Sequence, residues 1–381
     1  MSVLVDKVFK PINLDFPTDT SEDHLTSLHP YPARFIPAIP RCAIRSLLKT
    51  GGVVWDPFAG AGTSMIEALE NGHDAVGIDV NHLANFLQNT YLSKLKREEI
   101  TSLHALAFEF RLAKSFLTLE EALRQYSRIP NLEHWFSPGS IRAVGSYLQF
   151  LETSGMTENA KSAAKMALSR VLVRISRQQS DTQYRAVKKD ITMKSAIEII
   201  LKSLIEVAET MPLYQSRLGA GNAITRLGDA RESATYDNLP APDLIVTSPP
   251  YPNKYEYWLY HKYRMFWLDM DPIWSRSKEI GARPFYSGTG NLGPEDFASD
   301  MHKVLKNLTS VSKPSTLQVW VVGDGIIKGK PIYTSQVIAN EAQELGWTIL
   351  WQTSRAVQRK RSSFHGIGNL RREQILVMGR E

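Results

Sequence analysis

Short apolar runs and longer amphipathic stretches alternate along this chain, and their two spacings predict different elements. Seven runs rich in Val, Ile, Leu and Trp end in turn-forming residues, which is typical of buried strands. We expect strands at 53–58, 74–81, 223–230, 243–250, 317–325, 347–354 and 373–380. Apolar residues at three- and four-residue intervals predict helices between the middle ones, near 294–312 and 333–345. This order favours an α/β fold with a doubly wound sheet, whose last two strands form a C-terminal antiparallel hairpin.

The segment from about 90 to 215 has a different pattern, because helical spacing continues through it without strand signals. The pattern predicts a helical insertion and three parts of the chain. We expect an N-terminal arm and the first half of the sheet domain in 1–89, the insertion in 90–215 and the second half in 216–381. Six prolines in the first 40 residues forbid a long helix there, so HPYPARFIP at 29–37 is expected to be an extended arm.

Composition changes this picture little. The chain has 381 residues, of which 43% are hydrophobic and 22% charged, so it has ample material for a core. Its formal net charge of +6 is compatible with a polyanionic partner without identifying one. The single cysteine, Cys42, excludes an intrachain disulfide and a multi-cysteine zinc site. We find no leader and no apolar run of about 18 residues, and therefore expect a cytoplasmic protein without membrane contact.

A glycine-rich turn follows the first predicted strand, in VVWDPFAGAGTSMIEAL. A P-loop would need a Lys that this turn lacks, and a dinucleotide-binding turn favours a small residue where Met65 stands. S-Adenosylmethionine has no phosphate, so its site needs close backbone approach and carboxylates for its amines and hydroxyls. Gly60 and Gly62 give the room. Asp56 could face the methionyl ammonium, and Asp79 ends the second strand, where an acidic residue holds ribose hydroxyls.

The fourth predicted strand runs into VTSPPYPNKY, residues 246–255. Proline has no N–H, so Pro249 and Pro250 end the hydrogen-bonded ladder and stiffen the loop that follows. The loop presents the hydroxyl of Ser248, the carbonyl of Pro249 and the ring of Tyr251. It does so at the carboxyl end of a strand, where open α/β sheets bind ligands.

Three segments, DPFAGAGT, GIDVN and TSPPY, together resemble the amino-methyltransferases of DNA. HPYPARFIP is similar to the arm before the cofactor turn in the cytosine-N4 branch, and GDAR at 228–231 is similar to the family's acidic segment. The resemblance implies a Rossmann-like methyltransferase sheet, S-adenosylmethionine as cofactor, and contact between Asp229 and the cofactor's adenine amine. A Ser before the two prolines is associated with cytosine N4, whereas Asp or Asn is associated with adenine N6. The implied cofactor-binding residues are Tyr31, Phe35, Asp56, Pro57, Phe58, Gly60, Gly62, Thr63, Asp79, Val80 and Asp229.

The chain departs from that family in one respect. The family usually inserts its target-recognition domain beside the proline loop, whereas the long insertion here lies before GDAR. The sequence therefore leaves open which segment reads DNA.

The chemistry of an exocyclic amine explains the proline loop. The lone pair of the amine is delocalised into the ring, and two acceptors aimed at its hydrogens favour a tetrahedral nitrogen. The Ser248 hydroxyl and the Pro249 carbonyl can be those acceptors, and Tyr251 would stack on a base that has left the duplex. The predicted catalytic residues are Ser248, Pro249, Pro250 and Tyr251. Methylation at cytosine C5 would need a thiolate, and Cys42 lies in a predicted helix, so that chemistry is excluded.

Aromatic and basic segments supply the candidates for DNA contact. KYEYWLYHKYRMFW at 254–267 suits a helix whose aromatics are mostly core, with Lys254 and Tyr255 nearest the target nucleotide. Basic runs lie at 170–189 and 358–372, and the second links the last two strands. From it we expect phosphate contacts by Arg359, Lys360 and Arg361.

These features together predict a site-specific DNA methyltransferase that acts on the N4 amine of cytosine by base flipping, in a restriction-modification setting. Its partners would be DNA and, in that setting, a cognate endonuclease, and the chemistry needs no metal. Three alternatives stay open: adenine-N6 methylation of DNA, methylation of an RNA base, and a catalytically dead nucleic-acid-binding protein of the same fold.

Overall fold

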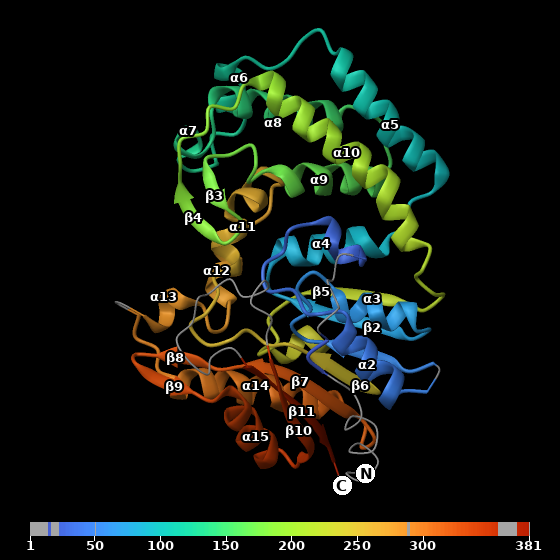
Figure 1. Cartoon of the computed structure of the whole chain (residues 1–381), viewed down its shortest axis with the longest axis vertical. Helices are drawn as coiled ribbons and strands as arrows, with labels where there is room; N and C mark the ends of the chain where they lie inside the picture. The colour runs from blue at the N-terminus through green and yellow to red at the C-terminus, as the bar shows by residue number, and fades with distance from the viewer. Residues whose placement is uncertain (1–13, 17–22, 50, 288–289, 357–371, 381) are drawn as a thin grey trace.

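One seven-stranded sheet organises the protein, which Figure 1 shows as a computed structural model describing residues 14–16, 23–49, 51–287, 290–356 and 372–380. The strands are β1 (Val53–Asp56), β2 (Asp74–Asp79), β5 (Ala223–Leu227), β6 (Leu244–Thr247), β7 (Leu317–Gly323), β10 (Thr348–Ala356) and β11 (Arg372–Gly379). Their order is β10-β11-β7-β6-β1-β2-β5. The last five in that order are parallel, whereas β11 pairs antiparallel with both β7 and β10. The predicted doubly wound sheet with its C-terminal hairpin is confirmed.

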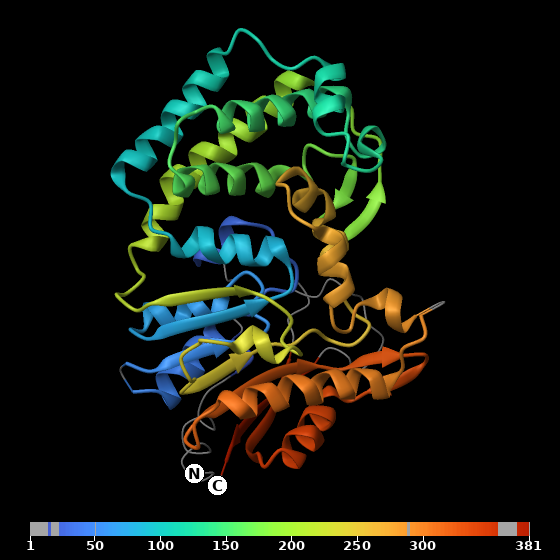
Figure 2. The same ribbon diagram turned by 180° about the vertical axis from the view of Figure 1, so that it is seen from behind.

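Both faces of the sheet are covered, because successive side chains of a strand point to opposite sides. Val54 and Val321 belong to one core, and Trp55 and Trp320 belong to the other. The first core is closed by α2 (Ala38–Leu47), α3 (Thr63–Glu70) and α4 (His82–Leu92). The second is closed by α14 (Pro294–Val311) and α15 (Thr334–Glu344), which lie in front of the sheet in Figure 2. Burial on both faces explains why these strands read as apolar runs rather than alternating patterns.

A mainly helical unit lies between β2 and β5 in the sequence and stands beside the sheet in Figure 1. Its helices are α5 (Arg97–Leu112), α6 (Leu119–Gln125), α7 (Leu132–Trp135), α8 (Pro138–Glu152), α9 (Glu158–Val171) and α10 (Met193–Gln215). Thr118, Ser137, Thr157 and Thr192 each cap a helix start with a side-chain oxygen. The unit's apolar side chains share one core with α4, and the three-part division at residues 90 and 215 stays a prediction.

Two short hairpins were not predicted. The helical unit contains β3 (Gln178–Ser180) paired with β4 (Gln183–Ala186), so the expectation of a segment without strands is wrong. A second hairpin, β8 (Gly325–Ile327) with β9 (Lys330–Ile332), follows β7. Strands of three or four residues are too short for a period-two pattern to show.

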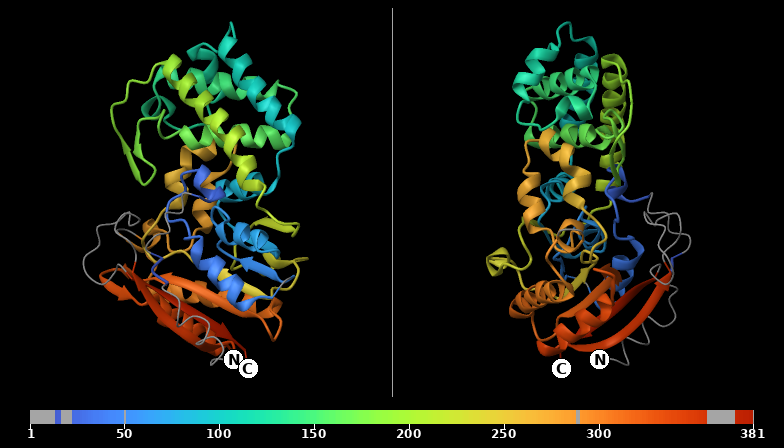
Figure 3. Two further views of the ribbon diagram at one scale, coloured as in Figure 1. Left: turned by 45° about the vertical axis from the view of Figure 1, so that its right-hand side comes forward. Right: turned by 90° about the vertical axis from the view of Figure 1, so that its left-hand side faces the viewer.

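The chain after the proline loop connects the sheet to the helical unit. It forms α11 (Tyr257–Trp267), α12 (Pro272–Lys278) and α13 (Arg283–Tyr286), and Figure 3 shows α11 and α12 between the two regions. The Tyr263 hydroxyl donates to the Pro130 carbonyl at 2.9 Å. Trp258, Tyr263 and Trp267 are buried, which confirms that the aromatics of this helix are mostly core. None of the helices in the described part of the chain has the length and apolarity needed to cross a bilayer.

Candidate active site

A cavity opens at the carboxyl ends of β1, β2 and β6, the edge at which open α/β sheets bind ligands. It encloses about 880 Å³, counting the open solvent at its mouth. Twelve of its lining residues were predicted from sequence: Tyr31, Phe35, Asp56, Pro57, Phe58, Gly60, Thr63, Asp79, Val80, Asp229, Ser248 and Pro250. The structure therefore brings the N-terminal arm, the glycine turn, the acidic segment and the start of the proline loop to one place. Of the other predicted cofactor and catalytic residues, Gly62, Pro249 and Tyr251 are not part of the lining.

The glycine turn after β1 depends on backbone conformations that suit glycine. Gly60 has φ +51° and Gly62 has φ +86°, the left-handed region that other residues rarely adopt. Gly62 immediately precedes α3 and is the N-cap of that helix. The Gly60 N–H donates to the Asp79 carboxylate at 2.8 Å, and its carbonyl accepts from the Gln88 amide at 2.8 Å. The turn is thus tied to the end of β2 and to α4.

Asp56 is buried at the end of β1 and holds the turn together. One carboxylate oxygen accepts from the Phe58 N–H at 3.0 Å and from the Thr247 hydroxyl at 2.6 Å. The other accepts from the Ser64 hydroxyl at 2.7 Å. Burial raises the pKa of Asp56 to about 6, although these three donors oppose that shift. The predicted contact with an ammonium would use lone pairs that remain free of these bonds.

Asp79 ends β2 and also lines the cavity. Its carboxylate accepts from the backbone N–H groups of Gly60 and Asn81, each at 2.8 Å. Burial raises the pKa of Asp79 to about 6, and the nearby Asp56 carboxylate adds to the shift. Two backbone donors hold this side chain in one orientation, with lone pairs left for a ligand.

Glu279 is a lining residue that sequence reasoning missed. It lies just after α12 and accepts from the backbone N–H groups of Tyr257 and Trp258 at 2.7 and 3.2 Å, at the start of α11. Burial raises the pKa of Glu279 to about 8, and the carboxylate of Asp79 adds to this shift. Its surrounding stretch SRSKEIGARPF has no spacing that predicts a site. Tertiary contact alone places it in the cavity.

The N-terminal arm closes one side of the cavity. Tyr31 stacks on Tyr257 at 5.9 Å and on His261 at 4.7 Å between ring centroids. The arm thereby packs on α11, whose first residue, Tyr257, is a second lining residue that the sequence did not reveal. Asp229, from the acidic segment, lines the cavity but is paired with the Arg231 guanidinium at 2.7 Å. Its predicted contact with an adenine amine would share a carboxylate already engaged by Arg231.

The proline loop is held in place by direct contacts with residues far along the sequence. The Tyr251 hydroxyl donates to a Glu373 carboxylate oxygen of β11 at 2.8 Å, and the other Glu373 oxygen accepts from Arg355 of β10 at 3.1 Å. The Ser248 hydroxyl lies 3.3 Å from the Tyr251 hydroxyl. Burial and then the Glu373 charge raise the pKa of Tyr251 well above its usual value, so the phenol stays protonated. A Cβ on Gly323 would lie 2.5 Å from the Tyr251 ring, so only glycine lets the ring pack there.

The predicted DNA-contacting residues are only partly described. The Lys254 ammonium lies 5.0 Å from the centroid of the Tyr251 ring, so a base stacked on that face would displace it. Tyr255 precedes α11 and packs against Tyr257 at 5.5 Å. Arg359, Lys360 and Arg361 lie outside the described residues.

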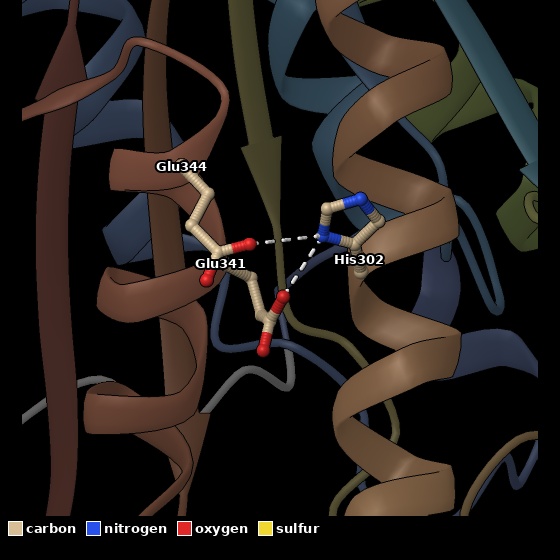
Figure 4. Close-up of side chains that lie close together, drawn as sticks. All are labelled: His302, Glu341 and Glu344. Atoms are coloured by element: carbon tan, nitrogen blue, oxygen red, sulfur yellow. Dashed lines mark hydrogen bonds and ion pairs between the residues drawn. The ribbon is translucent and has the colours of Figure 1, made fainter.

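One further cluster of polar side chains joins the two helices on the second face of the sheet (Figure 4). His302 of α14 lies 2.9 Å from Glu341 and 4.0 Å from Glu344, both of α15. None of the three lines the cavity. Their arrangement is that of an ion pair between neighbouring helices.

The side chains that line the cavity fit a cationic ligand that carries amines and hydroxyls. Four acidic side chains line it: Asp56, Asp79, Asp229 and Glu279. Burial makes the negative charges of Asp56, Asp79 and Glu279 costly, and a positive ligand would offset that cost. Apolar side chains suited to a purine ring border them: Phe35, Phe58, Val80 and Ile280. S-Adenosylmethionine, with an ammonium, a sulfonium, a ribose and an adenine, has the matching groups.

Comparison with known proteins agrees with this chemistry. A family model described as DNA methylase, of the N6 and N4 types, matches residues 8–84. The chain is 22% identical to the type II methyltransferase M.MvaI of Kocuria varians, across 94% of this chain and 90% of that protein. It is also 22% identical to the type II methyltransferase M.BsoBI of Geobacillus stearothermophilus, across 59% of this chain and 48% of that protein.

Solved structures show only a distant likeness. An rRNA methyltransferase, aviRa of Streptomyces viridochromogenes, aligns with 95% of this chain and 93% of its own at 13% identity and a TM-score of 0.35. The likeness to DNA methylases rests on the family match over residues 8–84 and on the two type II relatives. The chain is therefore similar to DNA methylases of the N6 and N4 types and to type II methyltransferases, and the lining of its cavity fits S-adenosylmethionine.

Proposed function

We propose that this methyltransferase modifies the exocyclic N4 amine of cytosine in DNA. The observation that carries the proposal is the shared cavity, which is lined by the glycine turn after β1 and by Ser248 and Pro250 after β6. A methyl donor bound at the glycine turn and a base held at the proline loop would meet inside this cavity. The Ser before the two prolines supports cytosine over adenine.

The carboxylates around the turn would hold the cofactor. Asp79 is oriented by the Gly60 and Asn81 N–H groups and would accept from ribose hydroxyls. Asp56 would face the methionyl ammonium, and Asp229 the adenine amine. Once bound, S-adenosylmethionine supplies an electrophilic methyl group on a sulfonium.

The hydrogen-bond order at the proline loop supports an acceptor role for Ser248. The Tyr251 hydroxyl gives its hydrogen to Glu373, so it receives rather than donates in its contact with Ser248. The Ser248 hydrogen is then used towards Tyr251, and the lone pairs of its oxygen remain for an amine hydrogen. With the Pro249 carbonyl as second acceptor, the amine would be held with its own lone pair towards the methyl group.

The target base would have to leave the duplex to reach this depth. Tyr251 is packed and hydrogen-bonded on several sides, so its ring is a fixed surface, and stacking there requires Lys254 to move aside. Close approach of two bound reactants then removes much of the entropic barrier. We further propose a restriction-modification setting with a cognate endonuclease, since both relatives named above are type II methyltransferases.

The experiment is to incubate the purified protein and S-adenosylmethionine with duplex DNA and with structured RNA, digest each to nucleosides and identify the modified one by mass spectrometry. N4-methylcytosine from DNA is the expected product. N6-methyladenine, or modified RNA alone, would overturn the proposal. Ser248→Ala should bind the cofactor with unchanged affinity and lose about 10²-fold in kcat, the usual cost of one preorganised hydrogen-bonding group.

A further inference from the structure

The β3–β4 hairpin of the helical unit has no part in the site described so far. Its two strands are joined by a two-residue turn, Asp181–Thr182, and pair Ser180 with Gln183. Figures 1 and 2 both show it beside α11, on the side of the molecule where β8 follows directly from β7. The carboxyl ends of the parallel strands point to that same side.

One face of the hairpin is anchored to α11. The Tyr184 ring packs on Trp135 at 4.4 Å and lies parallel to Tyr263 of α11 at 6.4 Å. Asp181, in the turn, forms an ion pair with Arg264 of α11, whose side chain is 1% exposed. The hairpin is therefore held in a fixed position relative to α11 by both stacking and charge.

The opposite face presents polar side chains to solvent. Gln183 and Arg185 flank Tyr184 in β4 and therefore point away from α11, and Gln179 of β3 is exposed at the irregular step in the pairing of the two strands. Within the described part of the chain, no hydrogen bond or ion pair engages the side chains of these three residues. Such unpaired groups make a surface ready for an external partner.

Unlike the side chains of this exposed face, most basic residues around the hairpin already form hydrogen bonds or ion pairs within the protein. Arg177 donates to the Glu133 carbonyl at 2.7 Å, and Arg170 pairs with Glu206 at 2.7 Å. Lys189 donates to the carbonyls of Val173 and Gln178. The basic run predicted from sequence is thus largely structural, and Arg185 is one of its cations that remains available.

The hairpin also lies at a suitable distance from the cavity. α11 begins at Tyr257, a lining residue, and Tyr263, which holds the hairpin, is six residues further along. A helix rises 1.5 Å per residue, so the two anchors are about 9 Å apart along its axis. This separation is about the length of three base-pair steps of 3.4 Å, so the hairpin and the cavity are close enough to contact one short stretch of duplex.

We propose that the β3–β4 hairpin reads base edges in the major groove of duplex DNA beside the flipped nucleotide, through Gln179, Gln183 and Arg185. The inference rests on the proposed DNA methylation. A two-stranded ribbon fits the major groove, which is about 12 Å wide. Gln pairs with adenine and Arg with guanine in that groove, each through two hydrogen bonds. The hairpin thereby supplies the reading element that the sequence left unassigned.

The test uses the full chain and a library of duplexes with randomised sequence. The wild-type protein first defines the methylated site and the base preference on either side. A variant carrying Gln179→Ala, Gln183→Ala and Arg185→Ala should fold normally, because all three side chains are exposed and unpaired. We expect it to lose roughly tenfold or more of the discrimination at one or more base pairs within about four of the methylated base. Its cofactor affinity, measured by calorimetry, should not change.

The matched control is Arg97→Ala, which removes an exposed arginine at the start of α5, and it should keep the wild-type preference. An unchanged preference in the triple variant would overturn the inference. So would equally weakened methylation of every sequence, which signals phosphate contact alone. Failure of the wild-type protein to methylate DNA would instead overturn the proposed function, and the inference with it.

Discussion

The glycine turn and the proline loop meet in one cavity, yet they are held in opposite ways. The turn is fixed by partners at the neighbouring strand ends: Gly60 is bonded to Asp79 at the end of β2, and Asp56 to Thr247 at the end of β6. The loop is fixed by residues far along the chain, because Tyr251 bonds to Glu373, 122 positions away.

Because of this difference, substitutions in the two regions should have different effects on stability, cofactor affinity and turnover. A change in the turn removes groups that both hold the backbone and would bind the cofactor, so stability and cofactor affinity should fall together. A change in the loop acts on contacts made by the C-terminal hairpin, so turnover should fall while cofactor affinity stays. Variants that break this pattern would show that the two regions are not independent.

The largest effect is expected for Asp79→Ala. The substitution leaves the N–H groups of Gly60 and Asn81 without their acceptor, and each unpaired buried donor costs about 1–3 kcal/mol. Urea unfolding should show a free energy of unfolding lower by about 2–4 kcal/mol. Cofactor affinity, measured by calorimetry, should fall by roughly 10- to 100-fold through loss of charged hydrogen bonds.

The matched control is Asp79→Asn, which keeps one acceptor oxygen and removes the charge. It should recover part of the stability while cofactor affinity stays low. If Asp79→Ala keeps full affinity for the cofactor, the assignment of this carboxylate to the cofactor fails.

A smaller effect is expected for Tyr251→Phe, which removes only the hydroxyl. Glu373 keeps its pairing with Arg355, so the unfolding free energy should fall by about 1–2 kcal/mol. The Ser248 hydroxyl would lose its fixed partner, and kcat should fall about tenfold with cofactor affinity unchanged. Tyr333→Phe is the control, because Tyr333 is 63% exposed and lies outside the cavity lining. A matching loss in both variants would contradict the positioning role of Tyr251.

The same contrast explains what could be predicted from the sequence. The strands and the turn depend on local patterns, such as the apolar run VVWD followed by AGAG, and both were predicted. Asp56 and Asp79 were found because they end strands that neighbour each other in the sheet. Local order along the chain was enough for these residues.

Long-range packing was not predictable in this way. Glu279 lines the cavity because its carboxylate accepts from the first N–H groups of α11, and the residue spacing around Glu279 does not predict that contact. Tyr251 was expected to face a base, but Glu373 and Gly323 fix its hydroxyl and ring. The β3–β4 hairpin was missed because its strands are short and polar.

An intermediate effect should appear in the pH dependence of cofactor binding. The raised pKa values, about 6 for Asp79 and about 8 for Glu279, mean that the folded protein holds protons that the unfolded chain would release. The protonated carboxyl of Glu279 therefore favours the folded state. Its contribution to the free energy of unfolding is fully present below the pKa of Glu279 in the unfolded chain, near 4.5, and is lost as the pH rises through 8. A cationic cofactor favours the charged carboxylates, so its affinity should rise with pH over the same window.

Calorimetry at about pH 6, 7 and 8, in two buffers of different ionisation enthalpy, would measure both the affinity and the protons released. We expect a rise of about three- to tenfold, with Glu279→Gln removing the upper part of the window and leaving the part that belongs to Asp79. Glu256 and Lys278 also lie near this carboxylate, so the variant rather than the profile alone identifies the group. An identical slope in Glu279→Gln would assign the titration elsewhere.

The smallest effect is expected for Lys254→Ala, and it tests the outer edge of the proline loop. Lys254 contributes little to the fold, because a cation over an aromatic ring is worth about 0.5–1 kcal/mol at a partly exposed site. Its removal should therefore change the unfolding free energy by less than about 1 kcal/mol. Filter binding should show roughly two- to fivefold weaker binding to all DNA sequences alike, because a lost phosphate contact carries no sequence information. Lys254→Arg should restore binding, since it returns the charge. If Lys254→Ala instead lowers cofactor affinity, the proline loop and the glycine turn are coupled. Even a residue at the outer edge of the loop would then affect cofactor binding, and the two regions would not be independent.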